Sequence, residues 1–356
     1  PFFDQDAGSR STYQYIKLFI SLGYKVLFLA DNFYEHQPYT NILRQQGVEV
    51  LTGSWFAQNW KKWLEEQSRY IDYIYLHRPH ISEVYIDVIN QLDYRPKVIY
   101  FGHDLHFVRV TRQAQLEGDD KLFKQAEDWR RREFDIFRKV DLILYPSEDE
   151  VKEILAVDSS LPAHTIPLNI YPKIDEVKSS FDQRTNLMFV GGFGHPPNKD
   201  AVMWFVNEVM PIILNVMPMV TLNIIGSKAD EEITSLESTN IKVMGRVSDD
   251  ELVSTYRNSL LSVAPLRYGA GVKGKVLESL NYGVPVVTTS IGAEGLPLVP
   301  QSLAVADNAL LFAEHIMRLC TNEKEWDRAV NAGYQLINSH FSKDAAIKAL
   351  EPFFEK

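Results

Sequence analysis

Short apolar runs rich in β-branched and aromatic residues alternate along the whole chain with longer segments of helical periodicity. This alternation is typical of βα units, in which helices cover a sheet of parallel strands. The apolar runs lie at 25–30, 48–51, 73–76, 97–100 and 142–145, and then at 186–190, 221–225, 241–244, 260–263 and 285–289. The sequence therefore predicts an α/β protein with two doubly wound, Rossmann-like sheets.

The 356 residues leave room for two hydrophobic cores of ordinary size. Pro162, Pro167 and Pro172 cluster before a polar stretch that ends near Arg184, where we place the linker. We expect domains at 1–167 and 168–340, and an amphipathic helix within 341–356 that packs back on the first domain. Because Pro1 opens a segment that resembles the loop after a strand, we expect that the first strand is missing and that the module comes from a longer chain.

Charge and cysteine content restrict the classes of partner and compartment. Lys and Arg number 37 against 47 Asp and Glu, a net charge of -10, so the chain has no uniform basic field for nucleic acid. The single cysteine, Cys320, excludes an internal disulfide and indicates a reducing compartment. No apolar run approaches the roughly 18 residues that span a bilayer. We expect a cytoplasmic protein, and peripheral association with the inner face of the membrane stays open.

A glycine-rich loop follows the run at 186–190. Gly191, Gly192 and Gly194 precede a helix expected near Asp200. Glycines between a strand and a helix let backbone N–H groups approach an anion closely. A plain strand-to-helix turn explains this loop equally well when it is considered alone.

A second loop, at 264–278, combines glycines with cations. Its glycines expose backbone donors at a helix N-terminus, while Lys273 and Lys275 supply positive charge, which is the combination that a diphosphate needs. Glu278 lies one helical turn beyond Lys275, where a carboxylate can accept hydrogen bonds from ribose hydroxyls. The alternative is an exposed Lys/Glu pair of no functional importance.

The order of these motifs resembles that of a known family. The segments that carry the resemblance are Gly191-Gly192 with Pro197-Asn198, Gly245-Arg246, the loop from Gly269 to Glu278, Gly283-Val284-Pro285-Val286-Val287 and the stretch 288–296. Together they resemble the donor domain of GT-B glycosyltransferases of the family 4 type, the glycosyl transferases group 1. In the first half, Asp6-Ala7-Gly8-Ser9-Arg10 resembles the family's first glycine-containing loop, and His103-Asp104 resembles its acceptor-side histidine.

The resemblance implies a GT-B architecture, in which two Rossmann-like domains face a central cleft. It also implies retaining transfer of a sugar from a nucleoside diphosphate sugar, with UDP or dTDP as carrier, without a divalent metal or other cofactor. The acceptor would be a glycan, a lipid-linked glycan or a glycoprotein. The implied setting is synthesis of a bacterial surface glycan or glycoprotein.

The same resemblance assigns residues to roles, one by one. The residues it implies for catalysis are His103, Arg246 and Lys275. Those implied for the donor nucleotide are Gly8, Gly191, Gly192, Arg267, Gly271, Val272, Lys273 and Glu278. On the acceptor side we expect Arg10, Asp104, Arg109 and Arg112.

Ala270 departs from the family pattern. Many members carry two glutamates separated by seven residues, and here Glu278 is the second while Ala270 takes the place of the first. The loss of a carboxylate that contacts the donor sugar favours a deoxysugar such as rhamnose. Equally, the backbone of Gly271 and Val272 can contact the sugar instead, and the sequence leaves both open.

Two rival functions also stay open at the level of sequence. A GT-B sugar-nucleotide epimerase would act on a free nucleotide sugar, and a catalytically inactive glycosyltransferase-like subunit would bind a partner enzyme. The basic run Arg130-Arg131-Arg132 lies among acidic residues, which favours a solvated helix face over docking to anionic lipid. The histidine pairs His103/His106 and His77/His80 lack a third ligand at a suitable spacing, so we expect no metal site.

Overall fold

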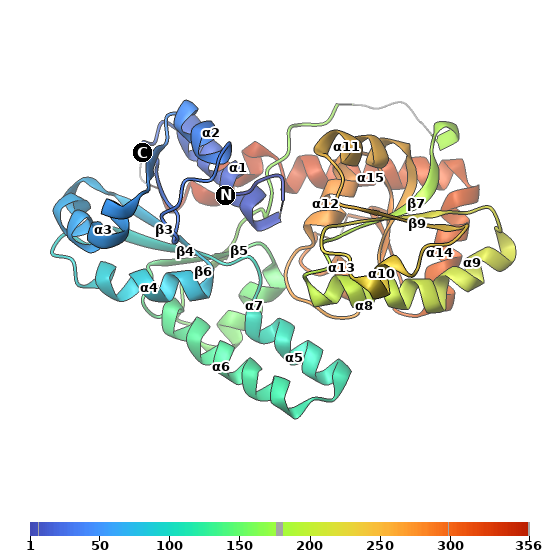
Figure 1. Ribbon diagram of the computed structural model, residues 1–356, viewed down its shortest axis with the longest axis horizontal. Helices are drawn as coiled ribbons and strands as arrows, with labels where there is room; N and C mark the ends of the chain where they lie inside the picture. The colour runs from blue at the N-terminus through green and yellow to red at the C-terminus, as the bar shows by residue number, and fades with distance from the viewer. Residues whose placement is uncertain (6, 176–180, 298, 355–356) are drawn as a thin grey trace. The chain divides into compact units, whose positions relative to one another are not determined.

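The computed structural model describes residues 1–5, 7–175, 181–297 and 299–354. These residues form two compact units, each shown in Figure 1. Unit 1 consists of Pro1–Phe107 and Asp120–Ile170, and unit 2 of Val108–Asp119 and Tyr171–Lys356. The helix α5 (His106–Glu117) therefore begins in unit 1 and continues in unit 2.

Unit 1 is built on parallel strands. A two-stranded sheet pairs β1 with β2, and a four-stranded sheet has the order β3-β4-β5-β6. The strands are β1 (Leu27–Leu29), β2 (Glu49–Leu51), β3 (Tyr73–His77), β4 (Lys97–Phe101), β5 (Leu142–Tyr145) and β6 (Ala163–Thr165). The helices are α1 (Ala7–Ser21), α2 (Tyr39–Gln45), α3 (Ser54–Gln67), η1 (Ser68–Tyr70), α4 (Pro79–Asn90), α6 (Asp120–Phe137) and α7 (Glu148–Val157).

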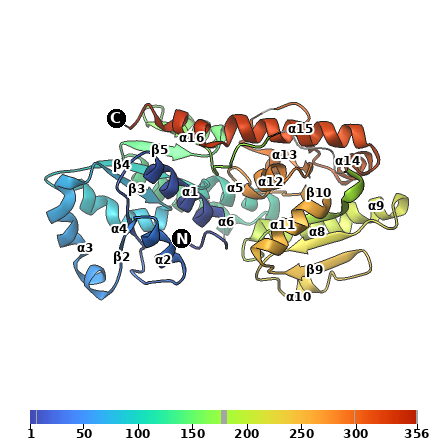
Figure 2. The ribbon, with the colours of Figure 1, turned by 90° about the horizontal axis from the view of Figure 1, so that it is seen from above.

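Unit 2 contains a six-stranded parallel sheet of order β12-β11-β10-β7-β8-β9. Its strands are β7 (Thr185–Val190), β8 (Leu222–Ile225), β9 (Ile241–Gly245), β10 (Ser259–Ala264), β11 (Val286–Thr288) and β12 (Leu303–Val305). Its helices are η2 (Phe181–Gln183), α8 (Pro196–Trp204), η3 (Phe205–Val209), α9 (Met210–Val216), α10 (Glu231–Thr234), α11 (Asp249–Asn258), α12 (Gly274–Asn281), α13 (Ser290–Ala293), α14 (Ala309–Thr321), α15 (Glu323–His340) and α16 (Lys343–Leu350). Figure 2 shows α15 and α16 as consecutive helices.

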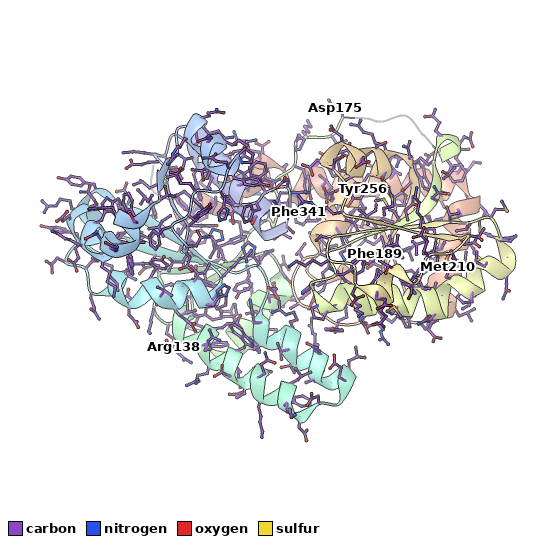
Figure 3. The ribbon with its side chains drawn as sticks, viewed as in Figure 1. Arg138, Asp175, Phe189, Met210, Tyr256 and Phe341 are labelled. Atoms are coloured by element: carbon purple, nitrogen blue, oxygen red, sulfur yellow. The ribbon has the colours of Figure 1, made fainter. Side chains whose placement is uncertain are left out.

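Both faces of the unit 2 sheet are buried. Leu187 and Phe189 pack into one hydrophobic cluster with residues of η3, α9 and α14, whereas Met188 between them packs with Tyr256 of α11 on the other face. Figure 3 shows Tyr256 and Met210 on opposite sides of the sheet. Because successive strand residues point to opposite faces, an uninterrupted apolar strand requires helices on both. Unit 2 is therefore doubly wound, as the sequence predicts.

The ten apolar runs all form strands, with ends that differ from the predicted ones by at most a few residues. Two strands, β6 and β12, were not predicted. Each is only three residues long, and β6 contains His164 and Thr165, so neither produces a long apolar run. Both lie at the edge of a sheet, where one neighbouring strand is enough to define them.

Candidate functional site

The strand order of unit 2 creates a point where neighbouring loops diverge. From β7 the chain moves outward to β8 and β9, and it then returns to the other side of β7 to form β10. In parallel α/β sheets ligands bind beyond the carboxyl ends of the strands at such a switch point. The two glycine-rich loops of the sequence follow β7 and β10, so the topology brings both of them to this place.

Close packing of these loops depends on glycine. A Cβ atom at Gly191 would lie 2.7 Å from Nζ of Lys275 and 2.8 Å from Cγ of Asn198. A Cβ atom at Gly226, after β8, would lie 2.0 Å from the carbonyl oxygen of Gly191. Such distances are too short for any side chain. The loop after β7 is therefore pressed between the loop after β8 and the lysine of α12.

Lys275 reaches this point from the first turn of α12 and contacts uncharged groups. Its ammonium donates a hydrogen bond to Oδ1 of Asn198 at 2.5 Å and lies 4.4 Å from the ring centre of Phe189. Asn198 is buried and donates to the carbonyl of Gly192 at 2.8 Å, which fixes its orientation. Burial, and next the charge of Lys273, lower the pKa of Lys275 from 10.5 to about 7.

An anionic ligand would give the ammonium of Lys275 a partner of opposite charge. In the part of the chain that the structure describes, no carboxylate forms an ion pair with Lys275. A cation in a low-dielectric site attracts an anion far more strongly than a cation in water does. The glycine loop beside it provides backbone for the same ligand. Lys275, Gly191 and Gly192 therefore form a candidate site for a phosphate group.

Glu278 lies one turn further along α12, on the same side as Lys275. Its Oε2 accepts a hydrogen bond from the hydroxyl of Tyr256 at 3.4 Å. Tyr256 is fully buried and stacks on Tyr282, with 5.0 Å between ring centres. Tyr256 thus holds the carboxylate of Glu278 one helical turn beyond Lys275, and its role beside the phosphate site stays a prediction.

The two arginines predicted for the donor lie in different surroundings. Arg267 forms a two-point ion pair with Asp200, with 2.9 Å between Nε and Oδ2. Arg246 is exposed after β9, at the edge of the sheet, and β8 separates β9 from β7. The structure describes no contact between Arg246 and Lys275 among the residues that it covers, so their joint action stays a prediction.

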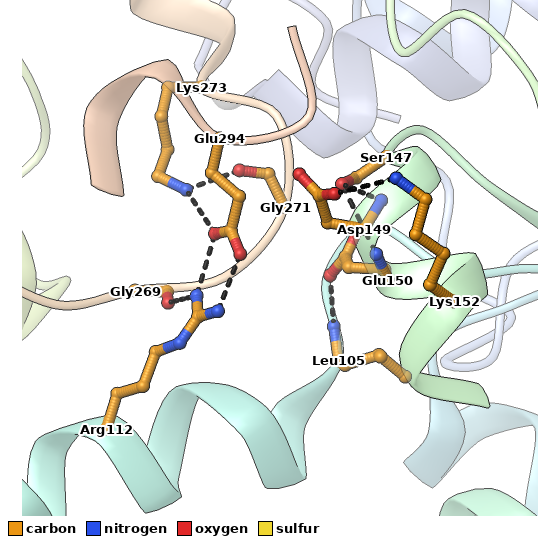
Figure 4. Close-up of polar contacts among 10 residues, drawn as sticks. All are labelled: Leu105, Arg112, Ser147, Asp149, Glu150, Lys152, Gly269, Gly271, Lys273 and Glu294. Atoms are coloured by element: carbon orange, nitrogen blue, oxygen red, sulfur yellow. Dashed lines mark hydrogen bonds and ion pairs between the residues drawn. The ribbon is translucent and has the colours of Figure 1, made fainter. Parts of the chain in front are cut away.

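A cluster of three charged side chains lies behind the loop after β10 (Figure 4). Arg112, from the part of α5 that belongs to unit 2, forms a two-point ion pair with Glu294 at 2.6 and 2.7 Å. The same guanidinium donates to the carbonyl of Gly269 at 2.8 Å. Lys273 donates to the carbonyl of Gly271, and its Nζ lies 3.6 Å from Glu294. The sequence assigned Arg112 to the acceptor side and assigned no role to Glu294.

In unit 1, His103 follows β4 and lies against a second histidine. Its Nε2 is 3.4 Å from Nδ1 of His77, and the two rings stack with 5.5 Å between centres. Burial, and next the proximity of His103, lower the pKa of His77 well below its usual 6.5. His77 is therefore neutral at neutral pH and leaves one cation at most in this pair.

Two buried carboxylates hold the loop that carries His103. Glu150 accepts the N–H of Leu105 at 2.7 Å, and Glu133 accepts those of His106 and Phe107 at 2.9 and 3.1 Å (Figure 4 shows the Glu150 contact). Ser147 caps the N-terminus of α7, and its hydroxyl accepts from the N–H groups of Asp149 and Glu150. The carboxylate of Glu150 turns to Leu105.

The other residues predicted for unit 1 and α5 have varied positions. Gly8 lies in the first turn of α1 and not in a loop, while Asp6 lies outside the described residues. Arg10 donates to the carbonyl of Phe3 at 3.3 Å. Asp104, which follows His103 in sequence, is half-buried. Burial raises the pKa of Tyr268, and Arg109, in the unit 2 part of α5, lies close enough for its positive charge to oppose this rise.

The basic run at 130–132 in α6 forms ion pairs with neighbouring acidic side chains. Arg132 forms a two-point ion pair with Glu83 at 2.7 Å and covers the ring of Trp129, and Arg131 pairs with Asp128. These ion pairs agree with the prediction that the basic run of α6 lies on a solvated helix face. No group of three His, Cys, Asp or Glu side chains among the described residues is arranged to hold a metal ion. Within the same residues, no helix has the length and apolarity needed to traverse a lipid bilayer.

The comparisons with known proteins agree with this geometry. Residues 184–322 match the family model of the glycosyl transferases group 1. An "uncharacterized 44.6 kDa protein in cps region" of Klebsiella pneumoniae is 32% identical over an alignment of 198 residues, which covers 53% of this chain and 49% of that protein. The chain thus spans about half the length of the curated relative that it matches.

Several solved structures match almost the whole chain. HepE of Anabaena, in complex with UDP and glucose, has a TM-score of 0.66 at 15% identity over 98% of this chain and 97% of its own. Sucrose-phosphate synthase from Thermosynechococcus elongatus has a TM-score of 0.70 at 14% identity, over 97% and 92%. Residues 184–322 of this chain are therefore similar to the glycosyl transferases group 1, and the chain has the fold of the GT-B glycosyltransferases.

Proposed function

We propose that this protein transfers a sugar from a nucleoside diphosphate sugar to an acceptor, with retention of anomeric configuration and without a divalent metal. The observation that carries the proposal is the Lys275 ammonium, which lies at the switch point of the unit 2 sheet with Asn198 as its hydrogen-bond acceptor. A diphosphate is the anion that best matches the backbone donors of the surrounding glycines and the positive charges of the lysines. The rest of the donor then extends along α12 to Glu278, whose carboxylate accepts from ribose hydroxyls.

Lys275 does more in this proposal than bind the donor. The leaving nucleoside diphosphate gains negative charge as the glycosidic bond breaks, and a fixed cation stabilises that state more than the ground state. Arg246 and the glycine backbone at 191–192 contribute in the same sense. These groups take the place that a divalent metal has in other sugar transferases.

UDP is the favoured carrier. HepE, which has the same fold, is described in complexes with UDP and with UDP-glucose. For the acceptor we propose a glycan, free or attached to a lipid or a protein, recognised by polar groups of unit 1 around His103. In the pair with neutral His77, His103 can exchange a proton with a sugar hydroxyl.

A panel of nucleoside diphosphates and nucleotide sugars, screened by thermal denaturation, tests donor binding. A ligand at 100 times its dissociation constant stabilises the folded protein by about 2.7 kcal/mol. We expect one base to be preferred, and turnover of its sugar conjugate to persist in EDTA. NMR of the product then reports its anomeric configuration. Turnover that stops in EDTA and returns with magnesium or manganese contradicts the metal-independent mechanism, and an inverted product contradicts retention.

A further inference from the structure

The charged cluster behind the loop after β10 holds the carbonyl groups of that loop. Arg112 binds the carbonyl of Gly269, and Lys273 binds that of Gly271. Glu294 contacts both cations, and its side chain and that of Lys273 are each only 10% exposed. One carboxylate therefore fixes the two cations that fix the loop.

The orientation of these carbonyls determines where the neighbouring N–H groups point. In a planar trans peptide the C=O of one residue and the N–H of the next point in opposite directions. With the carbonyls of Gly269 and Gly271 turned toward the cluster, the N–H groups of Ala270 and Val272 point away from it. Gly269 and Gly271 have φ of +146° and +71°, a backbone conformation that glycine adopts without strain.

We propose that Glu294 and Arg112 are positioning residues, which turn the N–H groups of Ala270 and Val272 toward the diphosphate of the donor. The inference rests on the proposed function, because it takes a nucleoside diphosphate as the ligand. Preorganised backbone donors stabilise an anionic group without reorganising when the ligand arrives. Arg112 suits this role because its planar guanidinium can bind a carboxylate at two points and a carbonyl at a third.

Calorimetric titration of UDP and of uridine into Glu294→Gln, Arg112→Met and the double variant tests this role. We expect each single substitution to weaken UDP binding about tenfold or more, and the double variant to lose little beyond that, because the two side chains act as one unit. Uridine has no phosphate and should bind these variants as it binds wild type. Arg112→Lys, which keeps the charge but not the planar fork, should lose an intermediate factor and serves if Arg112→Met does not fold.

Glu83→Gln is the matched control. It breaks the two-point ion pair with Arg132 in unit 1, a contact of the same geometry remote from the loop in sequence, and should leave UDP binding unchanged. Unaltered UDP affinity in folded Glu294→Gln overturns the inference, and so does an equal loss for UDP and uridine, which indicates general damage to the site. If wild type binds no nucleoside diphosphate at all, the proposed function fails first and this inference with it.

Discussion

A lysine with neutral partners destabilises the folded state whenever its amine is charged. Burial lowers the pKa of Lys275 from 10.5 to about 7. Between those two values the unfolded chain binds more protons than the folded chain, so this group makes stability rise with pH across that window. Below pH 7 the amine is charged in both states and the destabilisation is complete. A destabilising group of this kind is typical of binding sites.

Lys275→Met should therefore raise the melting temperature and abolish UDP binding. Methionine fills a similar volume without a charge, so we expect the gain to be largest at pH 6, a few degrees, and to shrink toward pH 10. Thermal denaturation of wild type and variant across this range measures the difference. A variant that is less stable than wild type at every pH contradicts the description of Lys275 as a strained cation.

The same group predicts how UDP affinity depends on pH. Because the anion favours the charged amine, binding raises the pKa of Lys275, and the protein takes up a proton when it binds UDP above pH 7. We expect affinity to fall between pH 7.5 and 9. Calorimetry in buffers of different ionisation enthalpy measures the uptake, and Arg267→Lys, which leaves Lys275 in place, should keep it. No uptake in wild type at pH 8 contradicts the prediction.

At Ala270 we expect control of the donor sugar. The missing carboxylate leaves a site without an acceptor, where an unpaired sugar hydroxyl loses about 1–3 kcal/mol. Wild type should prefer a deoxysugar donor, and Ala270→Glu should shift the ratio of specificity constants toward the fully hydroxylated sugar on the same base. Strong preference of wild type for glucose, with Ala270→Glu merely inactive, would point to the backbone of Gly271 and Val272 as the sugar contact.

Local spacing was enough to predict the relation between Lys275 and Glu278, which share one helix. It could not predict Arg112 and Glu294, which lie 182 residues apart in sequence and meet only through the fold. The same holds for Lys275 and Asn198, separated by 77 residues. The relation between two functional residues can be predicted from the sequence when both lie on one helix, but a contact between residues of different elements cannot.

At the scale of elements, the first turn of α5 depends on carboxylates from other helices. Glu133 of α6 uses both oxygens to accept two N–H groups of this turn, whereas Glu150 of α7 uses one for Leu105. An amide keeps one acceptor oxygen and presents a donor in place of the other. Glu133→Gln should thus lower the free energy of unfolding by about 1–3 kcal/mol, and Glu150→Gln by less.

Urea denaturation of the two glutamine variants measures this difference as a shift of the transition midpoint, with an unchanged dependence of the unfolding free energy on urea concentration. Equal midpoints for Glu133→Gln and wild type would show that the second oxygen contributes nothing. The sequence predicted that the run at 130–132 lies on a charged helix face, but it could not distinguish a glutamate of that helix that turns inward from one that faces solvent. The strands, in contrast, were predictable because each is a continuous apolar run within one short stretch of the sequence.

At the scale of the whole molecule, the chain divides into two compact units, and each unit consists mostly of one continuous stretch of the sequence. A division near residue 167 was predicted, and the units as found divide between Ile170 and Tyr171. The assignment of Val108–Asp119 to unit 2 had no sequence signal, because a segment flanked on both sides by unit 1 joins the other unit only through contacts such as Arg112 with Glu294. That α16 packs back on the first domain stays a prediction.

Titration of UDP into wild type and Glu278→Ala tests the central claim, that the switch point of the unit 2 sheet binds a nucleoside diphosphate through α12. Loss of a charge-assisted acceptor should weaken binding by about 1.5–3 kcal/mol, roughly 10- to 150-fold, while the melting temperature without ligand changes little. Should UDP not be the preferred ligand, the best nucleoside diphosphate of the panel takes its place. Equal affinity of wild type and Glu278→Ala for every diphosphate that binds would contradict the account.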